Sequence, residues 1–205
     1  MVAQPPPGAR VSPATARNRG PILEVLKSRL PARGRVLEVA AGAGEHAVFL
    51  AAALPDLQWL PTDPDPEALA SIAAWRGLAG LANLMAPVRL DAARPGAWPI
   101  ARAAAVVNIN MIHISPWAAA RGLMEGAGRL LPRGGGLFLY GPFIEADVET
   151  APGNLAFDLD LRRRDPAWGL RGLDEVAALA ERHGLEFSER VAMPANNLVA
   201  VFRKR

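Results

Sequence analysis

Cysteine is absent from the 205-residue chain. A disulfide framework, a thiolate nucleophile and a cysteine-ligated zinc site are therefore excluded, and a reducing compartment is compatible with the sequence. Lysine is scarce as well, since Lys27 and Lys204 are the only lysines in the chain. The formal net charge of +3 is carried by arginines dispersed through an alanine- and proline-rich sequence. This distribution fits a coding bias better than a phosphate-binding surface, so a nucleic-acid partner is not expected.

Long apolar runs are missing too. The most apolar segment, residues 101–114, predicts a buried strand with polar ends rather than a membrane span. Polar residues interrupt it at Arg102, Asn108, Asn110 and His113. We therefore expect no membrane partner.

The first ten residues, MVAQPPPGAR, lack the basic-then-apolar order of a secretory signal, and their proline run predicts a mobile tail. Hydrophobic residues make up 51% of the chain and charged residues 21%, which predicts a sizeable buried core. We expect a cytoplasmic protein with a flexible tail over residues 1–15 and a single domain over residues 16–205.

Strand and helix patterns alternate through the first two thirds of the chain. Apolar and β-branched runs predict strands at 35–39, 58–62, 87–90, 103–109 and 137–140. Helical spacing, bounded by proline and glycine, predicts helices at 22–30, 45–54, 67–77 and 116–131. Such alternation predicts a Rossmann-like α/β fold, with a parallel, doubly wound sheet and right-handed crossovers.

The last third departs from this alternation. Residues 141–171 are too many for a plain connector, so the segment is expected to be functional or partly structured. A helix is predicted at 173–183, followed by strands at 186–192 and 198–203. The short turn between these strands allows an antiparallel pair. The expected sheet thus has seven strands and is mostly parallel, with a C-terminal antiparallel pair.

A glycine-rich turn follows the first predicted strand. Gly42-Ala-Gly44-Glu-His-Ala47 satisfies the pattern G-x-G-x-x-A, and Asp63 lies about twenty residues further on, after the second strand. Glycine lets the backbone approach a ligand closely, and the acid accepts hydrogen bonds from ribose hydroxyls. Any cofactor that carries a nucleoside can use both features, so this motif alone does not exclude NAD(P) as the cofactor.

Glu38 favours a cofactor with an amino-acid part over a dinucleotide. Glu38 lies inside the first strand, four residues before Gly42, where a dinucleotide site normally has an apolar residue. A carboxylate there can bind a ligand ammonium, directly or through water, but is badly placed near a pyrophosphate. The alternative is a structural carboxylate that accepts hydrogen bonds from neighbouring backbone amides.

The segment from Glu38 to Gly44 resembles the E/D-x-G-x-G-x-G loop of class I S-adenosylmethionine-dependent methyltransferases, with Ala40 in place of the first glycine. In this resemblance, Asp63 corresponds to the acid that binds the ribose. Asp91-Ala92 corresponds to the acid after the third strand, which holds the adenine amino group.

Two further segments extend the resemblance over residues 35–140. Asn110-Met-Ile-His-Ile114 resembles the loop after the fourth strand, and Leu131-Pro-Arg-Gly-Gly135 resembles the turn before the fifth. The resemblance implies S-adenosylmethionine as cofactor, with S-adenosylhomocysteine as product. Its implied binding residues are Glu38, Ala40, Gly42, Gly44, Asp63, Asp91, Ala92, Asn108, Asn110 and Met111.

Three more residues are expected at the cofactor. Arg17 and Asn18 precede the first predicted helix and are expected to fold over the cofactor as a lid, the alternative being a simple helix entry. His46 lies in the first turn of a predicted helix and is expected near the carboxylate end of the cofactor. No metal site is expected.

A closer resemblance covers almost the whole chain. The chain resembles the methyltransferase-like protein twenty-six family, which has the fold but no established methyl acceptor. The matching segments are Ala16-Arg-Asn-Arg-Gly-Pro-Ile22, Asn110-Met-Ile-His-Ile-Ser-Pro-Trp117, Tyr140-Gly-Pro-Phe143, Phe157-Asp158, Arg162 to Pro166, Trp168-Gly169 and Met193-Pro-Ala-Asn-Asn197.

Methyl transfer from a sulfonium is an in-line displacement, so the protein chiefly positions acceptor, carbon and sulfur. A base is needed only where the acceptor must lose a proton. His113 is the candidate general base, the alternative being a histidine that hydrogen-bonds a loop carbonyl. Tyr140, the only tyrosine, is a candidate to orient the acceptor or the methionine part, the alternative being a packed aromatic at a strand end.

The sequence therefore predicts an S-adenosylmethionine-dependent methyltransferase that acts on a small molecule. Three alternatives remain open at this point: an NAD(P)-dependent oxidoreductase, a non-catalytic binding or regulatory module, and an RNA-modifying enzyme. The loop after the fourth strand does not read Asn-Pro-Pro-Tyr, which lowers the case for a DNA-adenine or glutamine acceptor.

Overall fold

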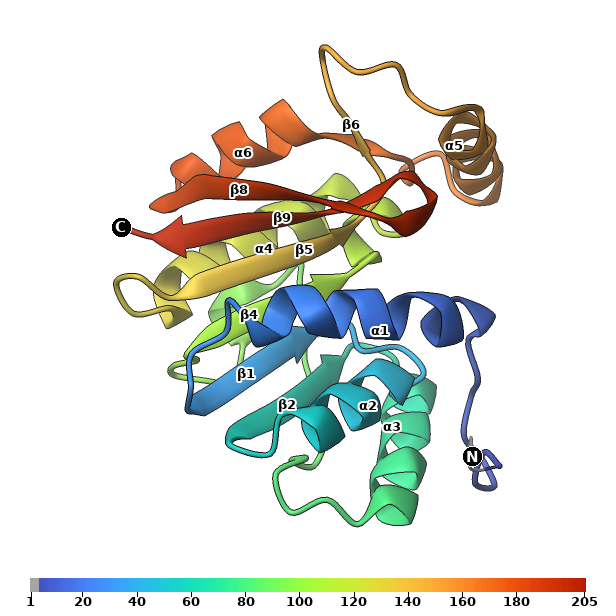
Figure 1. The fold of residues 1–205 in the computed structure, drawn as a ribbon, viewed down its shortest axis with the longest axis vertical. Coiled ribbons are helices and arrows are strands. Elements are labelled where there is room, and N and C mark those ends of the chain that lie inside the picture. Colours follow the sequence, from blue (N-terminus) through green and yellow to red (C-terminus); the bar gives the residue numbers. More distant parts are fainter. Residues whose placement is uncertain (1–3) are drawn as a thin grey trace.

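A seven-stranded sheet forms the centre of the molecule in the computed structural model, which describes residues 4–205 (Figure 1). Its strand order is β3-β2-β1-β4-β5-β9-β8. The strands are β1 (Gly34–Val39), β2 (Leu57–Asp63), β3 (Val88–Arg89), β4 (Ala105–Ile109), β5 (Gly136–Gly141), β8 (Leu185–Met193) and β9 (Asn197–Lys204).

The first five strands pair in parallel, and β9 pairs antiparallel with both β5 and β8. Every residue of β4 is buried, as expected for a central parallel strand that is covered on both faces. The predicted fold is therefore confirmed: a doubly wound, mostly parallel sheet of seven strands with a C-terminal antiparallel pair.

Helices cover both faces of this sheet. On one face, α1 (Pro13–Lys27) and α2 (Glu45–Ala53) bury apolar side chains against β1, β2 and β4, and α3 (Pro66–Ala79) packs beside α2. On the other face, α4 (Trp117–Leu130) and α6 (Leu173–Glu181) pack together and cover the second apolar core. Figure 1 shows α1 lying across the sheet at the β1–β4 boundary.

The first helix begins earlier than the sequence predicts. α1 starts at Pro13 and continues through Gly20-Pro21, so Arg17 and Asn18 lie within the helix rather than before it. The helix is held against the sheet by its buried side chains, Ile22, Val25 and Leu26. The free energy gained by this burial outweighs the local cost of a proline inside a helix. Pro21 has no N–H and therefore leaves the carbonyl of Arg17 without its helical donor.

Part of the segment expected as a tail is held against α3. The carbonyl of Arg10 accepts a hydrogen bond from Trp75 Nε1 at 3.0 Å, and the backbone N–H of Arg10 donates to Ser71 Oγ at 2.8 Å. The Arg10 guanidinium also pairs with Asp65 and Glu67. The ordered structure thus begins before residue 16.

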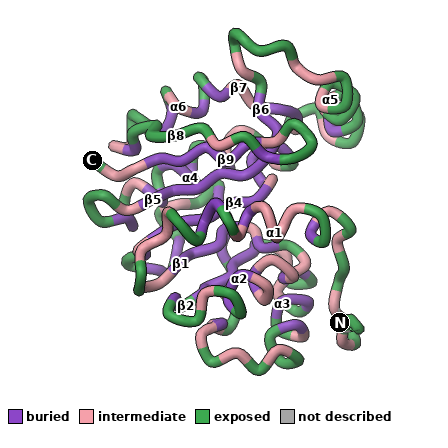
Figure 2. The backbone as a smooth tube through the Cα atoms, in the orientation of Figure 1, coloured by how far each residue is buried: buried purple, intermediate pink, exposed green. Residues whose placement is uncertain are grey.

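The segment 141–171 is partly structured, as predicted. It contains β6 (Phe143–Ile144) and α5 (Pro152–Arg164), and β6 pairs in parallel with β7 (Arg171–Gly172). In Figure 1, α5 stands beside the turn that joins β8 and β9. Figure 2 shows α5 almost wholly exposed, and Leu161 is its only buried residue.

No helix within residues 4–205 combines the length and the apolar character that a membrane crossing requires.

Candidate functional site

The glycine-rich loop between β1 and α2 is built from left-handed backbone. Ala40, Gly42 and Gly44 have φ angles of +57°, +56° and +91°. A Cβ atom at Gly44 would lie 2.9 Å from the Cα atom of Ile72, so the loop can pack against α3 only with glycine there. A Cβ atom at Gly42 would meet no atom within 4 Å, so this part of the loop is open to a ligand.

Asp63 at the end of β2 is tied to this loop. The Gly42 N–H donates to Asp63 Oδ2 at 2.9 Å, and the Asp65 N–H donates to Oδ1 at 3.0 Å. Burial raises the pKa of Asp63, although both backbone donors oppose that shift. The loop and the carboxylate are therefore held as one unit.

Glu38 lies beneath the loop and is 1% exposed. The indole Nε1 of Trp59 on β2 donates to Glu38 Oε2 at 2.6 Å. Burial raises the pKa of Glu38 to about 7, against the opposing effect of the Trp59 hydrogen bond. The structure thus gives Glu38 a partner that sequence reasoning missed, because an indole on a neighbouring strand leaves no local spacing signal.

The residues expected around an adenine follow β3. Asp91 is exposed and its Oδ1 accepts the N–H of Ala93 at 2.9 Å, while Ala92 is buried. Asp91 lines a hollow of about 400 Å³ together with Pro64 and Leu90. The end of β2 and the end of β3 therefore open onto the same space.

The end of β4 carries a buried amide with an unused acceptor. Asn108 Nδ2 donates to the carbonyl of Val39 at 2.8 Å, and Oδ1 has no partner within residues 4–205. Asn110 follows in the left-handed region at φ +64°, and Met111 is buried behind it. These residues lie where the loop after the fourth strand was expected.

Asn18 on α1 joins two other predicted residues. Asn18 Oδ1 lies 2.8 Å from His46 Nε2 on α2, and Asn18 and Tyr140, at the end of β5, line the same cavity. Burial lowers the pKa of His46 to about 4, with a smaller effect from the charge of Arg19. His46 is therefore neutral at pH 7 and can donate to Asn18.

A cavity of about 490 Å³ opens beyond Tyr140. It lies between α1, α5, the ends of β4 and β5, and the turn between β8 and β9. Its lining residues include Arg17, Asn18, Asn110, Tyr140, Phe157 and Asn197. Phe157 and Asn197 belong to segments that resemble family motifs, but the sequence did not predict that they share a site. Their proximity depends on the placement of α5.

His113 lies behind the cavity wall rather than on it. The side chain is fully buried, and neither ring nitrogen has a partner within residues 4–205. A Cβ atom at Gly141 would lie 2.5 Å from His113 Nε2, and the ring packs edge-on against Phe143. Burial lowers the pKa of His113 to about 3, helped by the charge of Arg171. The structure does not bring this ring to the cavity.

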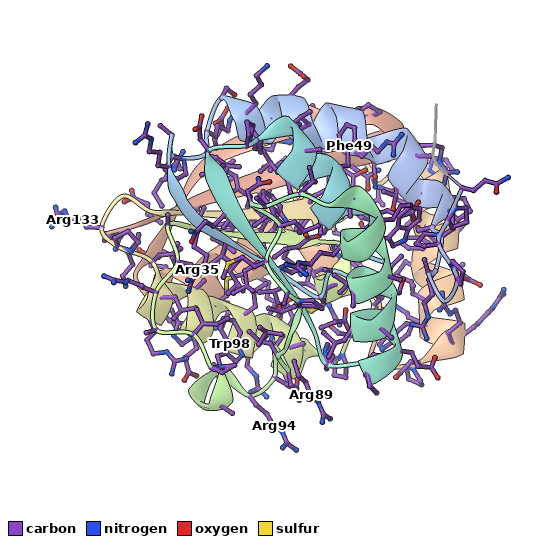
Figure 3. All side chains as sticks on the ribbon, turned by 90° about the horizontal axis from the view of Figure 1, so that it is seen from below. Arg35, Phe49, Arg89, Arg94, Trp98 and Arg133 are labelled. Atoms are coloured by element: carbon purple, nitrogen blue, oxygen red, sulfur yellow. The ribbon has the colours of Figure 1, made fainter. Side chains whose placement is uncertain are left out.

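Arginine side chains are scattered over the surface. Figure 3 shows Arg133 projecting from the turn between α4 and β5, away from Arg89 and Arg94. Within residues 4–205, no group of three or more histidine, aspartate or glutamate side chains could hold a metal ion.

Several solved structures share this fold. An O-methyltransferase family protein from Burkholderia thailandensis is 18% identical with a TM-score of 0.78, over 93% of this chain and 57% of that one. CalO1, a methyltransferase of calicheamicin biosynthesis in its SAH-bound form, is 18% identical with a TM-score of 0.74, over 94% and 55%. An O-methyltransferase family 2 protein from Planctomyces limnophilus in complex with apigenin is 19% identical with a TM-score of 0.76, over 94% and 60%.

The fold is therefore that of the class I methyltransferases, as the sequence motifs predict. The chain spans less than two thirds of the length of each of these proteins. The chain itself belongs to the family DUF938, described as "Protein of unknown function", whose model matches residues 9–204.

Proposed function

We propose that the protein is an S-adenosylmethionine-dependent methyltransferase that acts on a small molecule. The observation that carries the proposal is the joined unit of the open Gly42 loop and the Asp63 carboxylate, at the carboxyl ends of the central strands. The solved relatives named above, one with bound SAH and one with bound apigenin, support the same cofactor and a small acceptor.

The residues present fit this cofactor. The Gly42 loop and Asp63 would hold the ribose, and the hollow beside Asp91 would take the adenine. The unpartnered Oδ1 of Asn108, in β4 beside the last residue of β1, is an acceptor where the amino-acid part would lie. Bound S-adenosylmethionine supplies an electrophilic methyl group on a good leaving group.

The protein's own contribution is positioning. His46 holds the Asn18 side chain, and Asn18 lines the same cavity as Tyr140, whose hydroxyl can orient an acceptor there. Burial raises the pKa of Tyr140 above its ordinary value, so the hydroxyl stays protonated and acts as a donor. His113 serves the packing of the loop behind Gly141, and we assign it no proton transfer.

Calorimetric titration with S-adenosylmethionine, S-adenosylhomocysteine and NAD in parallel tests the cofactor. We expect the two adenosyl sulfur compounds to bind and NAD to give no heat. Asp63→Ala is expected to weaken their binding roughly 10- to 100-fold, since hydrogen bonds to a charged acceptor are lost.

Asp160→Ala is the matched control, because Asp160 is an exposed aspartate on α5. This variant is expected to bind as the wild type does. Binding of NAD alone would overturn the proposal. Tight binding of S-adenosylmethionine with no methylated product from any small-molecule pool would favour a regulatory module instead.

A further inference from the structure

The walls of the 490 Å³ cavity are mostly apolar. Phe157 is 39% exposed and Ile114 is 42% exposed, although both are large hydrophobic residues. Large apolar side chains left open to water beside a cavity mark a binding surface. With Pro21, Pro142 and Pro194 they form rigid walls that fit a flat apolar body, such as an aromatic ring.

The polar part of the lining carries a single kind of charge. Arg17 is the only charged residue type in the lining, and its side chain has no hydrogen-bond or ion-pair partner within residues 4–205. The other polar groups are the uncharged amides of four asparagines and the Tyr140 hydroxyl. The nearest hollow, of about 170 Å³, holds Glu145, and that carboxylate is bound by Arg190 at 2.6 Å. The electrostatic field in the cavity therefore favours an anion.

The lining residues also provide no proton acceptor of useful strength. Tyr140 stays protonated at neutral pH for the reason given above, and it is positioned as a donor. The His113 ring lies behind Gly141, out of contact with the cavity. An acceptor that must lose a proton in this cavity would find no side chain to take it.

We propose that the acceptor is a small apolar acid whose oxygen is already ionised at neutral pH, a carboxylate or an acidic phenol, and that Arg17 binds its negative charge. This inference rests on the proposed methyl transfer. The acceptor oxygen forms a bond to the methyl carbon while the carbon–sulfur bond breaks, and sulfur keeps the electron pair. No proton moves, so the step needs no base.

The inference reassigns Arg17. Arg17 was expected at the cofactor, but the cavity that it lines shares no wall residue with the glycine-rich loop, Asp63 or Asp91. Its lining comes from α1, the loop after β4, the end of β5, α5 and the β8–β9 turn, and it also includes Asn18 and Asn110, which were expected at the cofactor. Arg17 therefore lies on the acceptor side of the site.

Binding to the protein saturated with S-adenosylhomocysteine tests the inference without turnover. The probes are benzoate, benzamide and benzylamine, which are alike in size and differ in charge. A second pair is 4-nitrophenol and phenol, whose pKa is near that of tyrosine, about 10. We expect benzoate or 4-nitrophenolate to bind at least roughly tenfold more tightly than its uncharged partner. Which of the two pairs shows the preference distinguishes a carboxylate from a phenolate acceptor.

Two variants locate the binding. Arg17→Gln is expected to remove the preference for the anion and to leave the binding of benzamide and S-adenosylhomocysteine within about twofold. Arg133→Gln removes the same charge from an exposed turn at the opposite end of β5 and is expected to change nothing (Figure 3). Phe157→Ala is expected to weaken every aromatic probe, whereas Leu159→Ala, which changes a 57%-exposed leucine on the same helix, is not.

The outcomes separate the inference from the proposed function. The inference is overturned if benzylamine binds as tightly as benzoate or more tightly. It is also overturned if benzamide binds as tightly as benzoate and phenol as tightly as 4-nitrophenolate. The cofactor assignment stands in either case. An Arg17→Gln variant that loses S-adenosylhomocysteine and keeps the anion preference also overturns it, because Arg17 would then belong to the cofactor. Failure of the wild type to bind S-adenosylhomocysteine overturns the proposed function itself.

Discussion

The two sides of the site are built in different ways. On the proposed cofactor side, the loop between β1 and α2 is fixed by backbone geometry, and the helices that flank it bury side chains such as Leu50 and Ile72 completely. On the proposed acceptor side, α5 is mostly exposed (Figure 2): it buries only Leu161 and leaves Leu155 and Leu159 more than half exposed. A rigid half lined by backbone thus lies beside a thinly anchored half lined by side chains.

The largest expected effect breaks the rigid half. Gly44→Ala combines left-handed backbone strain at φ +91° with a contact of 2.9 Å to the backbone of Ile72. We expect the free energy of unfolding to fall by about 2–5 kcal/mol. Chemical denaturation measures it.

The matched change in the other half is Gly153→Ala. Gly153 lies in the first turn of α5, and a Cβ atom there would meet nothing within 4 Å. Alanine is expected to leave the protein unchanged or to stabilise it by up to ~1 kcal/mol. If Gly44→Ala and Gly153→Ala lower the free energy of unfolding equally, the proposed difference in rigidity between the two halves is wrong.

The next effect concerns how independently α5 unfolds. Leu161→Ala removes the only buried side chain of α5, a change that costs about 2–5 kcal/mol in a core. We expect this cost to appear as faster amide hydrogen exchange in α5 with little change in Tm. Leu50→Ala in α2 is expected to lower Tm and to speed exchange throughout the sheet. A global loss of protection in Leu161→Ala would show that α5 folds together with the core.

A third effect depends on pH and sharpens the description of the rigid half. Burial raises the pKa of Glu38 from 4.5 to about 7, so the folded state favours the protonated acid. The contribution of Glu38 to stability is therefore full below about pH 4.5 and is lost as the pH rises through 7. The Glu38→Gln variant has no such loss. Its free energy of unfolding is expected to rise relative to that of the wild type by on the order of 2–3 kcal/mol between pH 4.5 and 8.

The difference in the free energy of unfolding between the wild type and Glu38→Gln, measured across pH, separates the effect of Glu38 from that of the buried histidines. The pKa values of His46 and His113 are lowered, so their contributions rise with pH and cancel in the difference. Glu24→Gln, at an exposed position of α1, is the control and should track the wild type. A pH-independent difference for Glu38→Gln would mean that Glu38 is ionised in the folded protein.

The same contrast explains what the sequence could predict. The alternation of strands and helices, the Gly42 loop and the spacing to Asp63 are local or periodic patterns, and the structure places them as expected. The start of α1 was mispredicted because Gly20-Pro21 looks like a helix boundary, whereas burial of the following apolar face carries the helix through it.

Contacts between elements far apart in sequence left almost no such signal. Asn18, His46 and Tyr140 come together from three elements that are far apart in sequence, so no spacing could link them. The sequence also could not show that His113 faces the back of Gly141, because its neighbours allow both a general base and a histidine that hydrogen-bonds a loop carbonyl. Phe157 lies on a helix whose burial pattern has little amphipathic character, so its role depends on the tertiary placement of α5.

The smallest expected effect concerns a surface contact of the acceptor side. Arg190 on β8 binds Glu145, just after β6, through two hydrogen bonds of 2.6 and 2.8 Å, and this pairing lowers the pKa of Glu145. Arg190→Gln is expected to cost less than about 1 kcal/mol, because Arg190 is 42% exposed and the pair is screened by salt. A double-mutant cycle with Glu145→Gln at low and high salt measures the coupling. Since the folded pKa is lowered, the coupling should persist at neutral pH and vanish only as the pH falls below the ordinary range of a glutamate. A coupling well above 1 kcal/mol would mean that ion pairs anchor the acceptor side as firmly as burial anchors the cofactor side. The two halves would then be equally rigid, although different interactions would hold them.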